Sequence, residues 1–145
     1  MVVRLEFTSA FEMLDFVQVV SDHVGQTLGL DDDTQHYVGV AIRECVINAI
    51  KHGNRSDSHK HVFVEFSTVD SVLTIRVRDQ GEGFDPDTLA DPLAPENLLK
   101  ASGRGIFLIR SFMDEMVLQR APQGGMEVVM VKRVVAREFG LQNAE

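Results

Sequence analysis

Two polar side chains stand four residues apart in a stretch that otherwise has the pattern of a buried helix. In ECVINAIKHG, residues 44–53, Glu44 and Asn48 fall on the same side of a helix, because four residues make slightly more than one turn. Burying either group without a partner would cost on the order of 1–3 kcal/mol, so each must be exposed, locally hydrogen-bonded or directed at a ligand. The spacing E-x-x-x-N also arises by chance, and a solvated glutamate beside an ordinary helical asparagine is the alternative.

A second polar motif, DQGEGF, follows a predicted strand. It begins with Asp79, and the glycines Gly81 and Gly83 allow the backbone to turn with positive φ or to approach a flat ligand closely. A carboxylate at this position can accept a hydrogen bond from the exocyclic amine of a nucleobase. A turn at the end of a strand that contains Asp and Gly without any ligand explains the motif equally well.

A third motif, SGRGIFLI, places Gly103 and Gly105 at the predicted start of a helix. Free N–H groups at a helix N-terminus bind anions, and glycines let phosphate oxygens reach them. Lys100 and Arg104 would add positive charge nearby. Taken alone, a G-x-G pair is weak evidence, and a loop that joins a helix without a ligand is the alternative.

The hydrophobic pattern predicts the elements that would hold these motifs. Alternating apolar and polar residues predict strands, and apolar residues that recur every three or four positions predict helices. Ser9 and Glu12 have the spacing of a capping box for the first helix, which should end at Gly29, and the second helix should end at about His52, before Gly53. The predicted strands are residues 2–8, 61–69, 71–79, 116–121 and 124–135, and the predicted helices begin near residues 9, 31 and 103.

The order of these elements predicts an α+β fold. Strands mostly pair with chain neighbours while the helices come separately, which favours a two-layer sandwich with a mixed, mostly antiparallel sheet and helices on one face. The 145 residues suit one domain, residues 1–145. Three of the four prolines fall in residues 80–103, so we interpret residues 84–102 as a lid or binding loop. Residues 138–145 should form a frayed tail.

The composition limits the possible partners and the compartment. A hydrophobic content of 44% and a charged content of 25% are typical of a soluble globular protein. The net charge of −8 argues against nucleic acid and against an anionic membrane surface as partners. The single cysteine, Cys45, cannot form an internal disulfide, and the sequence has neither a signal-peptide pattern nor an apolar run of membrane-spanning length, so we expect a cytoplasmic protein.

In this order the three motifs resemble those of the GHKL ATP-binding family, which has the Bergerat fold. The resemblance covers about residues 35–133 and implies ATP and Mg²⁺ as cofactors. It also implies that Glu44 is the general base and that Lys100 and Arg104 lie near the phosphates. The remaining implied roles are Mg²⁺ coordination by Asn48, binding of the adenine amine by Asp79, shaping of the base pocket by Gly81 and Gly83, and phosphate contacts by Gly103 and Gly105.

Within this family, the length of the chain and the run LIRSFMDEM resemble the single-domain anti-sigma-factor serine kinases of the RsbW type. This implies a homodimeric protein serine/threonine kinase that binds a sigma factor and phosphorylates a STAS-type anti-anti-sigma partner. Ala101 stands where the family often has a positive residue, so the sequence does not identify which basic residue reaches the phosphates. The alternative is a non-catalytic module whose protein binding is gated by ATP or ADP. Glu44 favours the enzyme, because a carboxylate near phosphates would weaken simple binding.

Overall fold

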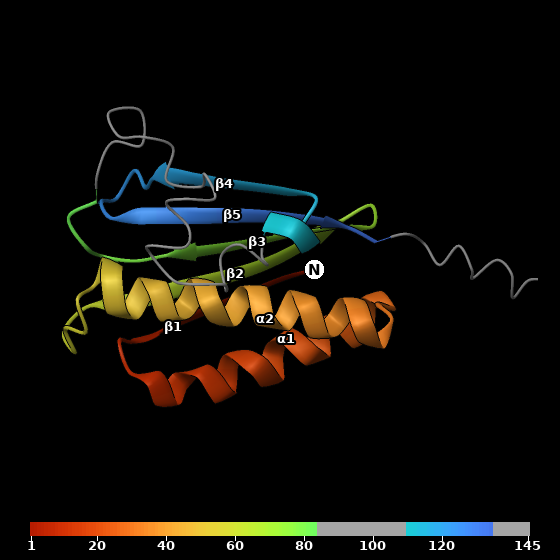
Figure 1. Cartoon of the computed structure of the whole chain (residues 1–145), viewed down its shortest axis with the longest axis horizontal. Coiled ribbons are helices and arrows are strands. Elements are labelled where there is room, and N and C mark those ends of the chain that lie inside the picture. The colour runs from red at the N-terminus through yellow and green to blue at the C-terminus, as the bar shows by residue number, and fades with distance from the viewer. Residues whose placement is uncertain (84–109, 135–145) are drawn as a thin grey trace, which may run out of the picture.

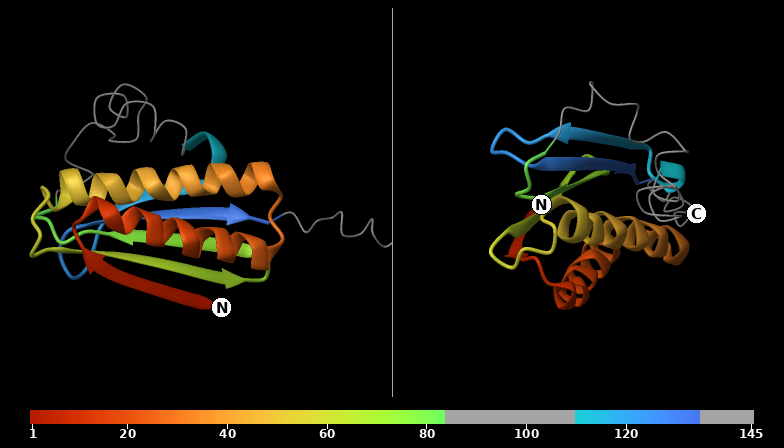
Figure 2. Two further views of the ribbon diagram at one scale, coloured as in Figure 1. Left: turned by 90° about the horizontal axis from the view of Figure 1, so that it is seen from below. Right: turned by 60° about the vertical axis from the view of Figure 1, so that its left-hand side comes forward.

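The computed structural model describes residues 1–83 and 110–134 of the 145-residue chain. This part of the chain folds into two layers, a sheet and a layer of helices that covers one of its faces (Figure 1). Two further views show both long helices on the same side of the sheet (Figure 2). The predicted α+β sandwich is therefore confirmed.

The sheet is built from β1 (Val2–Thr8), β2 (His61–Val69), β3 (Val72–Arg78), β4 (Glu115–Arg120) and β5 (Met126–Arg133). The strand order across the five-stranded sheet is β1-β2-β3-β5-β4. Every neighbouring pair is antiparallel, so the sheet that we expected to be mixed is antiparallel throughout the described residues. The pairing follows from two hairpins, β2–β3 and β4–β5, which place consecutive strands side by side.

Both hairpins turn through residues with positive φ. Asp70 and Ser71, between β2 and β3, have φ angles of 48° and 66°. Positive φ at both positions is the geometry of a type I′ turn, which matches the right-handed twist of the strands that it joins. Between β4 and β5, the glycines Gly124 and Gly125 have φ angles of 104° and 81°.

The first helix, α1 (Leu14–Leu28), follows a 3₁₀ turn, η1 (Phe11–Met13), and ends at Gly29, which has a left-handed φ of 78°. The predicted C-terminal stop is confirmed. The predicted capping box is wrong, because Ala10 takes the N-cap position and makes no side-chain cap hydrogen bond. Ser9 is buried, and its Oγ donates to the Lys60 carbonyl at 2.8 Å.

The second helix, α2 (Asp32–Asn48), carries the first polar motif. Asp31 caps it by accepting a hydrogen bond from the Thr34 N–H at 2.7 Å. The helix continues into a turn of π-helix, η2 (Ala49–Gly53), which agrees with the predicted end to within a residue. In this wider turn the Asn54 N–H donates to the Ala49 carbonyl at 2.8 Å. Single turns of π-helix are rare in proteins as a whole, and many of those that occur lie at functional sites.

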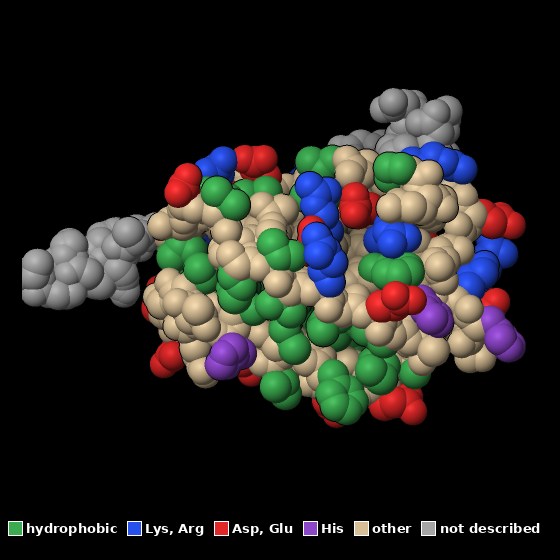
Figure 3. Space-filling model, turned by 180° about the vertical axis from the view of Figure 1, so that it is seen from behind, with side chains coloured by type: hydrophobic (Ala, Val, Ile, Leu, Met, Phe, Trp, Pro, Cys, Tyr) green, Lys and Arg blue, Asp and Glu red, His purple; other side chains and the backbone are tan. Residues whose placement is uncertain are grey.

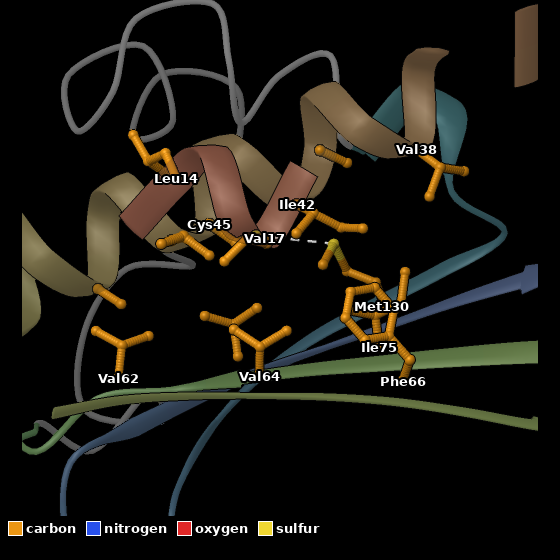
Figure 4. Packing of buried hydrophobic residues seen from close by; sticks show 14 of the residues in the cluster. Leu14, Val17, Val38, Ile42, Cys45, Val62, Val64, Phe66, Ile75 and Met130 are labelled. Carbon is orange, nitrogen blue, oxygen red and sulfur yellow. Dashed lines mark hydrogen bonds between the residues drawn. The ribbon is translucent and has the colours of Figure 1, made fainter. Parts of the chain in front are cut away.

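The core lies between the helices and the sheet (Figure 4). Val17 of α1 and Ile42 and Cys45 of α2 are buried against the central strands. The partners on the sheet include Val62, Val64, Phe66, Ile75 and Met130. Burial, with a smaller contribution from the nearby Glu44 charge, raises the pKa of the Cys45 thiol from 9.0 to about 12. Cys45 is therefore a core residue that keeps its proton.

The opposite face of the sheet carries charged side chains. Glu65 of β2 pairs with Arg4 of β1 at 2.7 Å and with Arg76 of β3 at 3.9 Å. Arg76 also pairs with Glu127 of β5 at 3.4 Å. Basic and acidic side chains lie next to one another on this side of the molecule (Figure 3). Because such pairs are exposed to water, each contributes at most about 1 kcal/mol, and together they keep this face polar.

Residues 110–112 are helical and lead through a bend into β4, so the helix that we predicted to continue through Glu115 ends earlier. The Phe112 ring stacks on Tyr37 of α2, with ring centroids 3.9 Å apart. Met113 is buried and Met116 packs against the core. No helix in the described part of the chain is both long enough and apolar enough to span a membrane.

Candidate functional site

Three segments that are far apart in the sequence meet around Asp79. Asp79 directly follows β3, and Gly53 ends η2. The two residues touch so closely that a Cβ on Gly53 would lie 2.0 Å from Asp79 Oδ2. On the other side, the Asp79 N–H donates to the carbonyl of Met126, the first residue of β5, at 3.0 Å. The end of η2 and the start of β5 therefore both contact Asp79, the residue that follows β3.

The two oxygens of this carboxylate have different surroundings. Asp79 is only 6% exposed, and its Oδ1 accepts from the Gly81 N–H at 2.9 Å and from the Met126 N–H at 3.1 Å. No described group donates a hydrogen bond to Oδ2, which lies beside Gly53. The backbone thus fixes the orientation of the side chain through one oxygen. The other oxygen keeps its capacity to accept a hydrogen bond, unused by any described group.

Three glycines make room for this arrangement. A Cβ on Gly81 would lie 2.1 Å from the Gly53 carbonyl oxygen, and one on Gly125 would lie 2.2 Å from the Asp79 carbonyl oxygen. A side chain at Gly81 or Gly125 would push these backbones apart, and one at Gly53 would displace the Asp79 carboxylate. Gly81 was predicted to shape this site, whereas Gly53 was interpreted only as a helix stop and Gly125 lay within a predicted strand. The glycine pair in the second hairpin was the available signal for Gly125.

Gly83 completes the loop after Asp79. Its φ angle is 75°, a conformation that favours glycine, and its Cβ position would lie 3.1 Å from the Gly125 carbonyl oxygen. Arg120, the last residue of β4, donates from Nη2 to the Glu82 carbonyl at 3.2 Å. The loop of the second motif is therefore attached to the β4–β5 hairpin on the side away from η2.

Glu44 and Asn48 lie on α2, in the segment that leads to Gly53. Both side chains are partly exposed, and within the described residues neither makes a hydrogen bond or an ion pair. Glu44 and Asn48 thus lie on the helix that leads, through η2, to Gly53 beside the Asp79 carboxylate.

One residue of this region was not indicated by the sequence patterns. Asn54 is fully buried, with 0% exposure, directly after Gly53. Its Oδ1 accepts from the Gln80 N–H at 2.7 Å, so it bonds to the residue that follows Asp79. A buried asparagine after a helix looks like an ordinary turn residue in the sequence, and its partners lie too far along the chain to be inferred.

Four predicted phosphate-site residues, Lys100, Gly103, Arg104 and Gly105, lie outside the described residues, as do the predicted lid and the predicted tail. Among residues 1–83 and 110–134, no group of three or more His, Cys, Asp or Glu side chains could hold a metal ion by itself.

Comparison with known proteins finds relatives over nearly the whole chain. The family model described as histidine kinase-like ATPase domain matches residues 8–132. The anti-sigma F factor of Oceanobacillus iheyensis is 32% identical over 134 residues, which cover 90% of each chain. The serine-protein kinase RsbW of Staphylococcus epidermidis is 27% identical over 139 residues, which cover 91% of this chain and 86% of the relative.

Two solved structures share the fold. The chain resembles a structure of the RsbU and RsbW domains of Rv1364c from Mycobacterium tuberculosis, with a TM-score of 0.66, 17% identity and coverage of 92% of this chain and 32% of that one. It also resembles a chain in the SiaB–SiaC complex from Pseudomonas aeruginosa, with a TM-score of 0.71, 11% identity and coverage of 89% and 88%. At these identities the similarity establishes the architecture alone.

Proposed function

Because this chain belongs to the family of histidine kinase-like ATPase domains, we propose that it is an ATP-dependent serine protein kinase that also acts as an anti-sigma factor. The observation that carries the proposal is the Asp79 carboxylate, which is fixed through Oδ1 and has no described hydrogen-bond donor at Oδ2. The names of the two sequence relatives, an anti-sigma factor and a serine-protein kinase, support the same activity.

Recognition of the base begins at Asp79. Oδ2 would accept a hydrogen bond from the exocyclic amine of adenine, which is a donor, whereas the corresponding oxygen of guanine or hypoxanthine would repel it. Glycine at position 53 leaves backbone rather than a side chain beside this oxygen, which would let a flat ring approach. These features fit an adenine nucleotide.

The phosphate side would be held by Asn48 and by the third motif. The Asn48 amide oxygen is a suitable ligand for Mg²⁺, a hard cation that also takes oxygens from water and phosphates. When bound, Mg²⁺ neutralises charge on the phosphates during transfer. We propose that the N–H groups of Gly103 and Gly105, with the charges of Lys100 and Arg104, hold the same phosphates.

Glu44 would be the general base. A serine hydroxyl must lose its proton as its oxygen bonds to the γ-phosphorus and the bond to the bridging oxygen breaks, releasing ADP. The Glu44 carboxylate, unpaired within the described residues and on the same helix as Asn48, would take that proton. Positioning of the serine against the γ-phosphate and neutralisation of phosphate charge would supply most of the remaining rate enhancement.

We further propose the partners of this reaction. The phosphoacceptor is a STAS-type anti-anti-sigma protein, the inhibited partner is a sigma factor, and the kinase works as a homodimer in the cytoplasm. These assignments rest on the resemblance of the sequence to RsbW-type kinases and on the relatives' names.

The test is transfer of labelled γ-phosphate from ATP to candidate STAS proteins encoded in the same genome. We expect a labelled serine on one of them in the presence of Mg²⁺. If no partner is labelled while ATP still changes the affinity for a partner, the chain is a nucleotide-gated binding module. If ATP neither binds nor changes partner binding, the proposed function is wrong.

A further inference from the structure

Asn54 joins four segments of the chain through its buried amide. Its Nδ2 donates to Ser9 Oγ at 2.8 Å and to the His61 carbonyl at 2.9 Å. Its Oδ1 accepts from the Gln80 N–H at 2.7 Å. Ser9 precedes η1, Asn54 follows η2, His61 begins β2 and Gln80 follows Asp79. Both amide hydrogens and the amide oxygen are therefore used, and all three bonds are short.

The bond to Gln80 acts on Asp79. The N–H of Gln80 belongs to the peptide group that follows Asp79, and the N–H of Asp79 itself is bound to the Met126 carbonyl at 3.0 Å. Both peptide groups that flank Asp79 are thus fixed, one by Asn54 and the other by β5. Fixing both planes restricts the backbone dihedrals of Asp79, and with them the direction of its carboxylate.

A second contact fixes the same residue from its side chain. Gln80 Oε1 accepts from the His61 N–H at 2.7 Å, so Gln80 is held both by its backbone and by its side chain. The His61 carbonyl in turn accepts a hydrogen bond from Asn54 Nδ2. Asn54, His61 and Gln80 therefore form a closed set of hydrogen bonds directly behind Asp79.

We propose that Asn54 is a positioning residue for recognition of the base: through the Gln80 peptide it sets the Asp79 carboxylate relative to the helix that carries Glu44 and Asn48. This inference rests on the proposed function, since it assigns the carboxylate to adenine. Asn54 directly follows η2, where the helix that carries Glu44 and Asn48 ends. It also bonds to Gln80, in the loop that follows Asp79. Nothing in this role requires Asn54 to touch the nucleotide.

The test compares binding of ATP with binding of inosine triphosphate, which has an oxygen in place of the adenine amine. Wild-type protein should prefer ATP by at least about tenfold, because the amine donates to Asp79 and the oxygen does not. In Asn54→Ala, the freed peptide should let the carboxylate turn, and the preference should fall by about threefold or more. Calorimetry with Mg²⁺ present gives both affinities.

Ser9→Ala is the matched control. It removes one partner of the Asn54 amide and costs stability, but it leaves the bond between Asn54 and Gln80 in place. We expect Ser9→Ala to keep the wild-type preference for ATP. A purely structural role for Asn54 would weaken binding of both nucleotides by the same factor and leave the preference unchanged in both variants, which would overturn the proposal.

If Asn54→Ala does not fold, Gln80→Pro takes its place, because proline has no N–H to donate to Asn54 Oδ1. Gln80→Ala is its control, since it removes only the side-chain contact with the His61 N–H and keeps the bond to Asn54. The preference for ATP should fall in Gln80→Pro and not in Gln80→Ala, and an unchanged preference in Gln80→Pro would count against the proposal. Failure of the proposed function looks different, because wild-type protein would then bind neither nucleotide. Amide exchange at Gln80, fast in Asn54→Ala and slow in Ser9→Ala, checks the hydrogen bond without any nucleotide.

Discussion

At the scale of single residues, the site depends on how hydrogen bonds are divided between atoms of one side chain. Asp79 uses Oδ1 for two backbone N–H groups and leaves Oδ2 without a described donor. A substitution that changes only Oδ2 can therefore test ligand binding while the contacts at Oδ1 are kept. Asparagine provides this change, because its amide oxygen can take the place of Oδ1.

Asp79→Asn should bind ATP roughly 30- to 1,000-fold more weakly, a loss of about 2–4 kcal/mol. With its oxygen on the Gly81 and Met126 N–H groups, the amide would place an NH₂ donor against the donor amine of adenine. Isothermal titration calorimetry measures the affinity. Asp70→Asn is the control, because Asp70 lies in the turn at the other end of β3 and asparagine tolerates its left-handed φ of 48°. Wild-type affinity in Asp79→Asn would remove Asp79 from the base site.

Glu44→Ala should keep or slightly increase ATP affinity and reduce serine phosphorylation by roughly 10²- to 10⁴-fold. The reason is that the carboxylate repels phosphates in the bound state and is needed only when the hydroxyl loses its proton. Asn48→Ala should instead reduce both, since a metal serves binding and transfer alike. Single-turnover transfer to a STAS partner, measured beside ATP affinity, separates these effects. Transfer at the wild-type rate by Glu44→Ala would contradict the assignment of the base.

At the scale of elements, the site is a junction between a helix end and two strand ends. The π turn η2 brings Gly53 against Asp79, and the start of β5 supplies the N–H and carbonyl groups on the other side. Because these contacts leave no room for a Cβ, glycine is needed at the closest approaches. The position of η2 relative to β3 therefore depends on the absence of a side chain.

Gly53→Ala should weaken ATP binding strongly and lower the melting temperature, because its Cβ would overlap Asp79 Oδ2. Gly29→Ala is the contrasting control: Gly29 has a φ of 78° but no atom within 4 Å of its Cβ position. It should lower stability by about 1 kcal/mol through backbone strain alone and leave ATP affinity unchanged. Equal loss of ATP affinity in both variants would show that general destabilisation, rather than the contact with Asp79, controls binding.

At the scale of the whole molecule, the two layers hide the only thiol from water. The chain has one cysteine, Cys45, which is 2% exposed and lies between α2 and the sheet, with its Sγ 3.7 Å from Met130 Sδ. The folded state therefore prefers the neutral thiol more strongly than the unfolded chain does. This preference links the stability of the whole domain to pH in the alkaline range.

Stability should fall above about pH 9 partly because of Cys45. The pKa of its thiol is raised from 9.0 to about 12, so the contribution is complete below pH 9 and is lost as the pH rises towards 12. In this window the unfolded chain releases a proton that the folded chain keeps, which lowers the free energy of unfolding by about 1.4 kcal/mol per pH unit. Urea unfolding of wild type and Cys45→Ala between pH 8 and 11 should show a shallower decline in the variant. Parallel declines would show that Cys45 contributes nothing.

Local patterns predicted most of the fold and part of the site. Alternation predicted β1 and both hairpins, and Gly29 predicted the end of α1, because these features depend on neighbouring residues. Ser9 was misinterpreted because its partner, the Lys60 carbonyl, is 51 residues away. The roles of Gly53, Gly125 and Asn54 were missed for the same reason, since each is defined by a contact with another segment. Asp79 could be named as a candidate because its signal is local: an aspartate that follows an apolar strand and precedes Gly81 and Gly83.

The pairing of β3 with β5 has a consequence for the order of folding. The hairpins β2–β3 and β4–β5 close over short turns, whereas the bond from the Met126 N–H to Asp79 Oδ1 joins residues 47 apart in the sequence. Closing that longer loop costs more chain entropy and comes later than hairpin formation. We therefore expect the Asp79 site to mature only when the two halves of the sheet have joined. A fluorescent adenine nucleotide would then report the last step of refolding rather than the first.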